Sequence, residues 1–414
     1  MNPTECSDAT FDMFGRPPVD TSVEQCYDTE ILPLSSITGH TIEFKIPGEG
    51  EEFVDLSESR LHMGIEVTKS DGSEVEAGQV KLCRLYPAAL FKQCDMYLNS
   101  TLVTTSSAMY PYVSYMSALL SFPKAVKNDQ LDVLEHFNGA DVPKGGKVES
   151  FSRLYLPLMN QDRLIPNNVD ILLRLSRASN DFVLQRVGDA NTDTYKINIK
   201  SISLFVRKIK PSPNILLDHA NMFSKSNAVF PITRIFSKYH TLQKGDQSYE
   251  INNVVLGHLP ARLVVGLVES DSFTGDLKKD CFEFKPHGLK QISLVVNGRS
   301  IPQQPITIDA EENQYRRAYY SLISTMQDTC EDSESLGISG EDYLSKSCFF
   351  GFPLSKVLAS KTDAVPVRED GSVVCRLLFK EKLKTNLNVI FCMEYQNNTI
   401  ELDSAKQVYL DFPA

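Results

Sequence analysis

Residues 91–122, FKQCDMYLNSTLVTTSSAMYPYVSYMSALLSF, are the most informative stretch of the chain, because their pattern occurs a second time. Lys92–Leu98 alternates in polarity and stops at Asn99-Ser100, and Lys290–Val296 alternates in the same way and stops at Asn297-Gly298. A period of two indicates a half-buried strand, and Asn-Gly supplies the two positive-φ residues that a tight hairpin turn needs. Each copy is therefore predicted to form a β-hairpin.

A helix is predicted after each hairpin. In both copies, apolar residues recur at i, i+3, i+4, i+7 and i+8, which places them on one face of a helix. The first set is Tyr112, Tyr115, Met116, Leu119 and Leu120, and the second is Tyr315, Ala318, Tyr319, Leu322 and Ile323.

Two further pairs of segments indicate a duplication. Upstream of the hairpins, Arg60–Ile65 is matched by Arg262–Leu267, and downstream Leu156–Leu158 is matched by Phe352–Leu354. All four matches occur in the same order and lie roughly 200 residues apart, whereas any one of them alone would be weak. Together they predict two copies of one domain fold.

Composition limits the class of protein. The 414 residues carry a net charge of −11 with the signs mixed along the chain, which argues against coating nucleic acid, because phosphate binding needs a positive field. The nine cysteines are scattered and never in C-x-x-C spacing, which favours buried free thiols over disulfides or zinc. No apolar run approaches the roughly 18 residues that cross a bilayer, and the polar N-terminus does not look like a signal peptide. We therefore expect no membrane span, and a chain that is soluble and intracellular when made.

The chain is predicted to be all-β, with two tandem antiparallel sandwiches and short helices in their loops. Residues 1–27 have no periodicity and are predicted to be an N-terminal arm, extended unless a partner holds it. A first domain is expected over 28–212, a linker with a short helix over 213–228, and a second domain over 229–414.

Alternation and apolar runs predict the remaining strands. In the first domain these are Ile31–Leu34, Thr41–Ile46, Arg60–Val67, Phe151–Leu158, Val169–Leu175 and Ile197–Ile209. In the second domain they are Pro231–Phe236, Arg262–Glu269, Ser347–Phe352, Val373–Phe379, Leu387–Tyr395 and Val408–Leu410. Long loops are expected at 124–147, with a helical turn or two around Gln130–Phe137, and at the acidic stretch Asp328–Glu334.

Two glycine-rich segments superficially resemble functional loops. Gly139–Lys147 has the wrong spacing for a phosphate-binding loop, and Val148 stands where Ser or Thr would have to hold magnesium. Gly337–Gly340 does not match the G-x-S-x-G nucleophile elbow, so an ordinary loop is predicted there.

The charged and metal-ligating residues also indicate no active site. The seven histidines form neither H-x-H nor H-E-x-x-H, the usual local patterns of a zinc site. Arg207-Lys208 with Lys210 is the one tight basic cluster, which either touches a phosphate or, as we favour, lies at a solvated strand end near the domain junction. We therefore predict no catalytic, cofactor-binding or metal-binding residues, and a protein that is not an enzyme.

Over roughly residues 16 to 410, the chain resembles the double jelly-roll major capsid proteins of Maverick/Polinton elements and adintovirus-like viruses. The resemblance is carried by Ile31–Ile37 with Ile42–Phe44, Tyr97–Asn99 with Tyr110–Tyr112, Leu204–Lys208, Leu259-Pro260 with Arg262–Val268, and Tyr315 with Tyr319–Leu322.

The resemblance implies two eight-stranded jelly rolls and a homotrimer whose six jelly rolls form a pseudo-hexagonal capsomer. It also implies a structural role in an icosahedral shell, with neighbouring capsomers and a minor (penton) capsid protein as partners. Localisation would be the virion, after synthesis in the cytoplasm and assembly there or in the nucleus. Loops shorter than those of the tower-bearing members of the wider lineage argue against elaborate outer decorations.

Three further expectations follow. A rival hypothesis is a two-domain jelly-roll carbohydrate-binding protein, although the absence of tryptophan counts against the aromatic platform that it would need. A domesticated host copy that does not assemble is a second rival hypothesis.

The N-terminal arm is predicted to order only against a neighbouring subunit or a minor capsid protein, since it is poor in apolar residues yet contains Phe11, Met13 and Phe14. No strong direct binding to DNA is expected, because the first dozen residues carry Glu5, Asp8 and Asp12 and no arginine.

Overall fold

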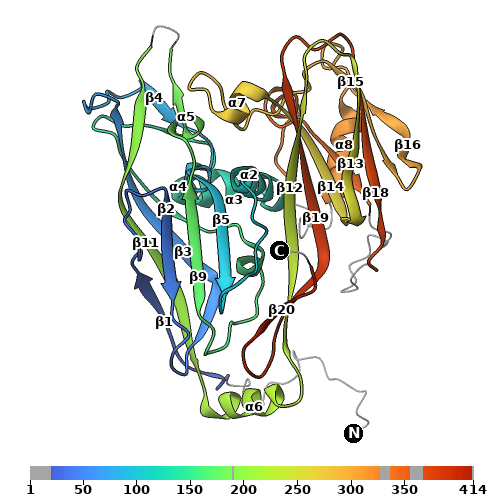
Figure 1. Ribbon diagram of the computed structural model, residues 1–414. Helices are drawn as coiled ribbons and strands as arrows, with labels where there is room; N and C mark the ends of the chain where they lie inside the picture. Colours follow the sequence, from blue (N-terminus) through green and yellow to red (C-terminus); the bar gives the residue numbers. More distant parts are fainter. Residues whose placement is uncertain (1–19, 189–190, 327–335, 355–366, 413–414) are drawn as a thin grey trace, which may run out of the picture.

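The computed structural model describes residues 20–188, 191–326, 336–354 and 367–412, which form two β-sandwiches side by side (Figure 1). The first sandwich, coloured blue to green, lies on the left of Figure 1, and the second, yellow to red, lies on the right. Helix α6 (Pro213–Phe223) forms the foot of the molecule and joins the last strand of the first sandwich to the first strand of the second.

Two four-stranded antiparallel sheets, ordered β1-β11-β3-β8 and β2-β9-β5-β6, build the first sandwich. Its strands are β1 Val23–Ile31, β2 Thr41–Ile46, β3 Phe53–Lys69, β5 Phe91–Leu98, β6 Thr101–Leu102, β8 Lys147–Ser152, β9 Ile171–Arg177 and β11 Tyr195–Pro211.

The second sandwich has the sheet orders β12-β19-β14-β17 and β13-β18-β15-β16, with β20 added against the end of β19. Its strands are β12 Ala228–Leu242, β13 Ser248–His258, β14 Arg262–Glu269, β15 Leu289–Val296, β16 Arg299–Thr307, β17 Phe349–Pro353, β18 Asp370–Phe379, β19 Leu387–Leu402 and β20 Val408–Leu410.

The two halves have the same topology. In each, the first, last, third and sixth principal strands make one sheet, and the second, seventh, fourth and fifth make the other. This is the strand order of a jelly roll. The structure thus confirms the predicted fold, two tandem eight-stranded jelly rolls, and the strands β3 and β14 that carry Arg60–Ile65 and Arg262–Leu267 occupy equivalent places.

The repeated hairpin also forms as predicted. Asn297 and Gly298 both have positive φ, 49° and 79°, as do Asn99 and Ser100, at 45° and 72°. These dihedrals give a two-residue turn whose twist matches the flanking strands. Glycine adopts the second position without steric cost, whereas Ser100 does so with a Cβ in place.

Short helices and one small sheet occupy the loops. The helices are α1 Tyr86–Ala89, α2 Tyr110–Ser121, α3 Lys124–Asn128, α4 Gln130–Glu135, α5 Asn180–Val183, α7 Ser270–Thr274, α8 Arg316–Met326 and α9 Gly340–Ser345, with a 3-10 turn, η2, at Pro157–Asn160. The small sheet joins β4 Val80–Leu82 to β7 Ala140–Asp141 and β10 Leu184–Arg186. The two helices predicted after the hairpins are α2 and α8, and α4 is the predicted helical turn in the loop 124–147.

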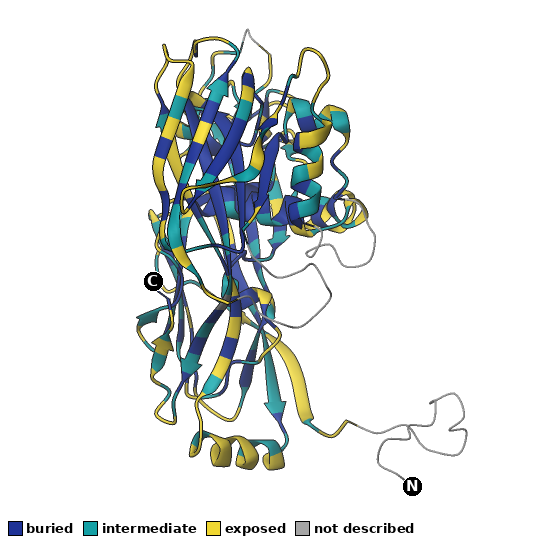
Figure 2. Cartoon of the chain, turned by 90° about the vertical axis from the view of Figure 1, so that its right-hand side faces the viewer, coloured by how far each residue is buried: buried dark blue, intermediate teal, exposed yellow. Residues whose placement is uncertain are grey.

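The core lies between the sheets of each sandwich and continues from one sandwich into the other. Alternate residues of the strands are buried, as in β2, where Ile42, Phe44 and Ile46 point inward. Buried side chains of both halves form one contiguous hydrophobic cluster, and Figure 2 shows them running through the interior while α6 stays outside.

Several boundaries differ from the sequence prediction. Strand β1 begins at Val23, inside the segment expected to be an arm, because residues 23–31 pair with β11. Residues 1–19 lie outside the described part of the chain, so an arm there stays a prediction, and the acidic loop at 328–334 also lies outside it. The strand expected over Phe151–Leu158 ends at Ser152, and Pro157, which lacks an N–H for a ladder, opens η2 instead.

Gly64 and Gly266, which the duplication aligns, provide a matched test of the packing. A Cβ on Gly266 would lie 2.6 Å from Cδ1 of Phe284 and 3.0 Å from Cδ1 of Phe349, both buried, whereas a Cβ on Gly64 would meet only the Ser201 hydroxyl. We expect Gly266→Ala to lower the free energy of unfolding by about 1–3 kcal/mol, through overpacking, and Gly64→Ala to have a much smaller effect. Denaturant unfolding of both variants measures this, and equal effects would contradict the described packing around Gly266.

Candidate functional site

The extended contact between the two jelly rolls is the most developed feature of the described residues. Helix α2 lies in this seam (Figure 1), where the ring of Tyr115 stacks on Phe282 with 4.5 Å between centroids, and Tyr112 stacks on Phe273 at 5.3 Å. Tyr112 also meets Phe284 edge-on at 6.2 Å. Aromatic pairs of this kind add to the burial of their large apolar surfaces. The seam therefore joins the two jelly rolls through a shared aromatic core.

An ion pair crosses the same seam. Nη2 of Arg84 lies 3.1 Å from Oδ2 of Asp280, and Nη1 donates a hydrogen bond of 2.8 Å to the hydroxyl of Tyr115. The two charged side chains are only 17% and 19% exposed. Partial burial reduces screening by solvent, so this pair links the halves more strongly than a surface pair would.

A second set of contacts ties the halves together near the foot. The side-chain amide of Asn99, in the turn of the first hairpin, donates a hydrogen bond of 2.8 Å to the backbone oxygen of Lys406, which lies in the turn before β20. The Lys406 ammonium lies 3.0 Å from the ring centroid of Phe223 on α6. Burial lowers the pKa of Lys406 to about 8, although Asp403 opposes the shift. The first jelly roll, the linking helix and the last hairpin thus meet at one point.

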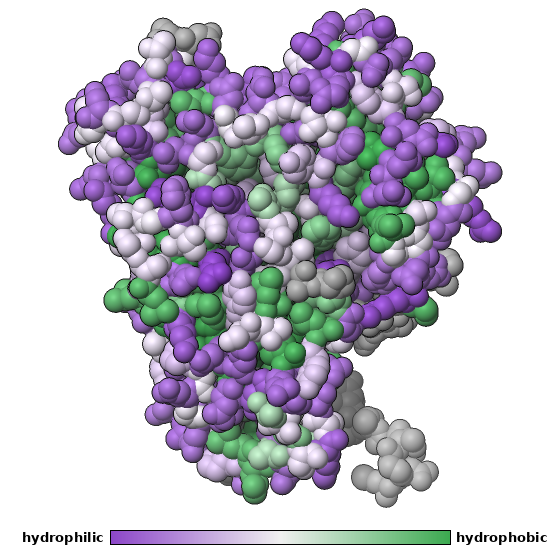
Figure 3. Space-filling view, in the orientation of Figure 1, coloured by the Kyte–Doolittle hydropathy of each residue, from purple (hydrophilic) through white to green (hydrophobic). Residues whose placement is uncertain are grey.

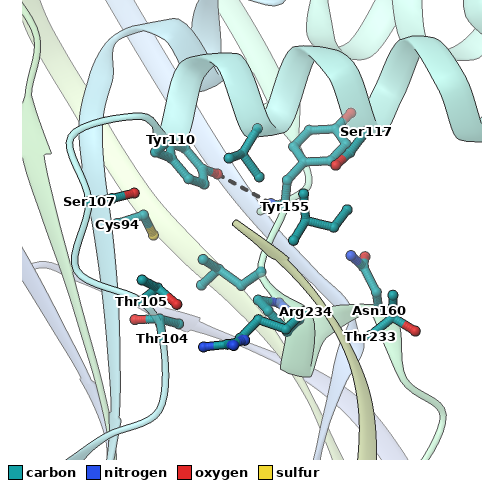
Figure 4. A pocket seen from close by; sticks show the side chains of 14 residues that line it. Cys94, Thr104, Thr105, Ser107, Tyr110, Ser117, Tyr155, Asn160, Thr233 and Arg234 are labelled. Atoms are coloured by element: carbon teal, nitrogen blue, oxygen red, sulfur yellow. Dashed lines mark hydrogen bonds between the residues drawn. The ribbon is translucent and has the colours of Figure 1, made fainter. Parts of the chain in front are cut away.

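A small pocket opens into the seam between α2 and β12 (Figure 4). Its volume is about 50 Å³, room for a few water molecules, and its lining combines the hydroxyls of Thr104, Thr105 and Tyr110 with Cys94 and Arg234. The Tyr110 hydroxyl accepts a hydrogen bond from the backbone N–H of Tyr155 at 3.2 Å, the dashed line in Figure 4.

The ionisable groups of this pocket are not activated. Burial raises the pKa of the Cys94 thiol and of the Tyr110 hydroxyl well above their ordinary values, so both are protonated at neutral pH. A nucleophile or base requires the opposite shift. The guanidinium of Arg234 packs 4.9 Å from the ring centroid of Tyr395 and 4.8 Å from that of Phe412. These groups support the seam and do not form a catalytic constellation.

Glu135, at the end of α4, has a raised pKa because of burial, a property that is also typical of catalytic acids. Its surroundings indicate a structural role. Oε2 accepts a 2.6 Å hydrogen bond from the Tyr155 hydroxyl, and Oε1 accepts one of 3.0 Å from the backbone N–H of Arg153. With 2% of its surface exposed, the carboxyl cannot meet a substrate and instead fastens α4 to the segment after β8.

The glycine-rich segments weighed in the sequence have structural roles. Gly139–Lys147 contains β7 and the first residue of β8, with Gly145 and Gly146 in turns at positive φ. Ser339 caps α9: its hydroxyl accepts a hydrogen bond from the backbone N–H of Asp342 at 3.1 Å.

Acidic neighbours neutralise the basic cluster at the end of β11. Arg207 pairs with Asp28 at 3.0 Å, Lys208 with Glu52 at 2.8 Å, and Lys210 with Glu24 at 3.3 Å. Of the two alternatives, a strand end near the domain junction describes this cluster, since each cation already has a carboxylate partner, although Lys208, at 14% exposed, is less solvated than expected.

Histidines and cysteines form no metal site in the described ranges, where no group of three potential ligands occurs. His62 lies 2.7 Å from Oε1 of Glu149, and His136 reaches only the backbone oxygen of the same residue. The seven described cysteines are free thiols, buried as expected except for Cys26 on β1. None of the helices described is long and apolar enough to span a bilayer.

Tyr112 and Tyr115 lie on the predicted helix face, whereas their ring partners and the Arg84–Asp280 pair were not predicted from the sequence. Arg84 lies among Leu82, Cys83 and Leu85, and a single charge in such an apolar run is the signal that it has a buried partner. Phe282 and Phe284 alternate around Glu283, a pattern too short to be read as a strand.

The topology, the packed seam and the linking helix define the class: a double jelly roll, the fold of a group of viral major capsid proteins. Compared with solved structures, the chain matches a chain of the Sputnik virophage cryo-EM structure with a TM-score of 0.63, at 11% identity, over 100% of this chain and 94% of that one. It matches the Faustovirus major capsid protein with a TM-score of 0.59, at 8% identity, over 93% and 92% of the two chains.

The mavirus major capsid protein matches with a TM-score of 0.54, at 11% identity, over 99% of this chain and 93% of that one. These solved structures are of viral capsids or virus particles and not of enzymes. A curated relative, an uncharacterized protein of Caenorhabditis elegans, is 23% identical over 374 residues, which cover 85% of this chain and 88% of the relative. No family model matches the chain.

The inter-domain ion pair gives a test of the seam. Arg84→Met keeps the apolar stem but leaves the carboxylate of Asp280 without this cation, so we expect a loss of about 3 kcal/mol in unfolding free energy. Arg376→Met, which removes the exposed pair of Arg376 with Glu250, should cost at most about 1 kcal/mol. Denaturant unfolding compares the two variants, and a cost for Arg84→Met no larger than that of the control would show that the pair does not stabilise the seam.

Proposed function

We propose that this chain is a structural major capsid protein that forms homotrimeric, pseudo-hexagonal capsomers and tiles an icosahedral shell. The observation that carries the proposal is the presence of two jelly rolls of identical strand order, packed into one body by the seam of α2. Three such chains around a threefold axis present six similar units, which is the shape needed for near-hexagonal packing.

Neighbouring capsomers and a minor, penton capsid protein are the proposed partners, and the virion is the proposed location. A hexagonal unit tiles flat sheets, so a closed shell needs a different protein at its fivefold vertices. We also propose a relationship to the capsid proteins of Maverick/Polinton elements and adintovirus-like viruses. The relative from Caenorhabditis elegans supports this assignment, because a similar chain in an animal fits a capsid gene carried in a host genome.

The first test is the mass of the purified protein. Because obligate interfaces commonly bury about 2,000–5,000 Å², the trimer should persist on dilution. Light scattering at micromolar concentration should give three times the chain mass of 46.4 kDa, and electron microscopy should show particles with a hexagonal outline or closed shells. A stable monomer would rule out the trimer.

A second test concerns the genome. With Arg207, Lys208 and Lys210 neutralised by carboxylates and a net charge of −11, we expect no submicromolar binding to double-stranded DNA at about 150 mM salt. Lys210 also lies 3.6 Å from Oε2 of Glu51, so the triple variant Glu24→Gln, Glu51→Gln, Glu52→Gln removes the carboxylates of Lys208 and Lys210 and should strengthen binding and its salt dependence. Tight DNA binding by the unaltered protein would overturn the expectation of no strong direct binding to DNA.

A further inference from the structure

A pocket of about 560 Å³ lies at the foot of the molecule, where the two jelly rolls meet α6. Its apolar wall comes from three parts of the chain: Phe53 at the start of β3, Leu164 and Pro166 before β9, and Phe230 on β12. Met222 and Phe223 of α6 complete it. This volume falls in the range of pockets that bind ligands or side chains of a partner.

Helix α6 is amphipathic in sequence but is only partly covered, on the side of Phe223, which packs against the core. Of its eleven residues, all of which the structure describes, none is buried, and Leu217 and Met222 are 64% and 55% exposed. Figure 2 shows the helix as exposed, and Figure 3 shows hydrophobic side chains gathered over it at the foot. A helix of this kind normally buries its apolar side, so exposed apolar residues next to an apolar pocket mark a docking surface.

The end of the described chain points to the occupant. The backbone N–H of Ser212, the residue before α6, donates a hydrogen bond of 2.8 Å to the backbone oxygen of Ser22. The described chain therefore begins, at residue 20, beside the first turn of this helix. The eleven residues of α6 span about 16 Å. The six Cα–Cα steps from Phe14 to Asp20 can extend about 20 Å, enough to bring Phe14 to Met222.

The chemistry of this segment matches the pocket. Phe11, Met13 and Phe14 are apolar, and Asp12 between them is acidic. The exposed part of the pocket carries Arg163 and the ring of His219, which stacks on Phe53 at 5.6 Å. An apolar floor with the Arg163 guanidinium at its rim suits apolar side chains on both sides of a carboxylate.

We propose that residues 11–14 of the same chain dock into the pocket beside α6, with Phe11, Met13 and Phe14 on its apolar wall and Asp12 facing Arg163. This assigns the N-terminal segment a site on its own chain, in contrast to the neighbouring subunit or minor capsid protein that the sequence predicts. The inference does not depend on the capsid role. Attachment in the same chain favours this site, since the segment is held near the pocket at high effective concentration.

The test uses the full chain with Phe14 replaced by the photo-crosslinking amino acid benzoylphenylalanine. After irradiation, mass spectrometry should join residue 14 to Met222 or its neighbours in the pocket, and denaturing electrophoresis should show the product at the single-chain mass of 46.4 kDa. A product at twice that mass would place a second copy's segment in the pocket and overturn the proposal. Crosslinks only outside the pocket would overturn it as well.

A matched pair of variants shows whether the contact is specific. Met222 is exposed when the pocket is empty, so a charge there should not disturb folding. Met222→Glu should lower the yield of the pocket crosslink about tenfold, because docking would bury that charge. Leu256→Glu on β13, at a position 76% exposed and outside the pocket, should leave the yield unchanged. An unchanged yield in Met222→Glu would show that the pocket does not receive the segment.

Discussion

The packing of α2 against the second jelly roll is the contact on which the rest of the architecture depends. Tyr112 and Tyr115 belong to the first half of the chain, yet their ring partners Phe273, Phe282 and Phe284 belong to the second. Because all of these rings except the half-buried Phe273 are buried, separating the halves would expose a wide aromatic surface to water. Two domains that could have been joined by a flexible linker therefore behave as one body with a common core.

The two helices that follow the repeated hairpins, α2 and α8, differ in how much of their surface is buried. Helix α2 buries nine of its twelve residues, whereas α8, which follows the second hairpin, buries four of its eleven. Both carry the same apolar spacing, and α8 packs on β17 of its own jelly roll. The position of each copy in the assembled chain, and not its own pattern, decides how much of the helix is covered.

Ion pairs join distant segments both in the partly buried parts of the molecule and on its surface. Two partly buried pairs, Arg84 with Asp280 and Glu135 with Arg153, join separate segments, and each is supported by a tyrosine hydroxyl. On the outer surface the basic end of β11 is matched by carboxylates of β1 and the β2–β3 region. This arrangement leaves the described surface there without the concentrated positive field that binds nucleic acid.

The sequence by itself determined the features that depend on neighbours along the chain. The Asn297-Gly298 turn, the alternation of Lys290–Val296 and the helical spacing after it all act within a few residues, and their repetition revealed the duplication. Tertiary structure alone decided where distant segments meet. Val23–Ile31 becomes a strand only because β11 lies beside it, and Arg84 pairs with Asp280 nearly two hundred residues away. Helix α6 buries none of its residues fully, because the described segments contact only one side of it. Periodicity reports which side of an element is apolar, but the partner of that side depends on how the whole chain folds.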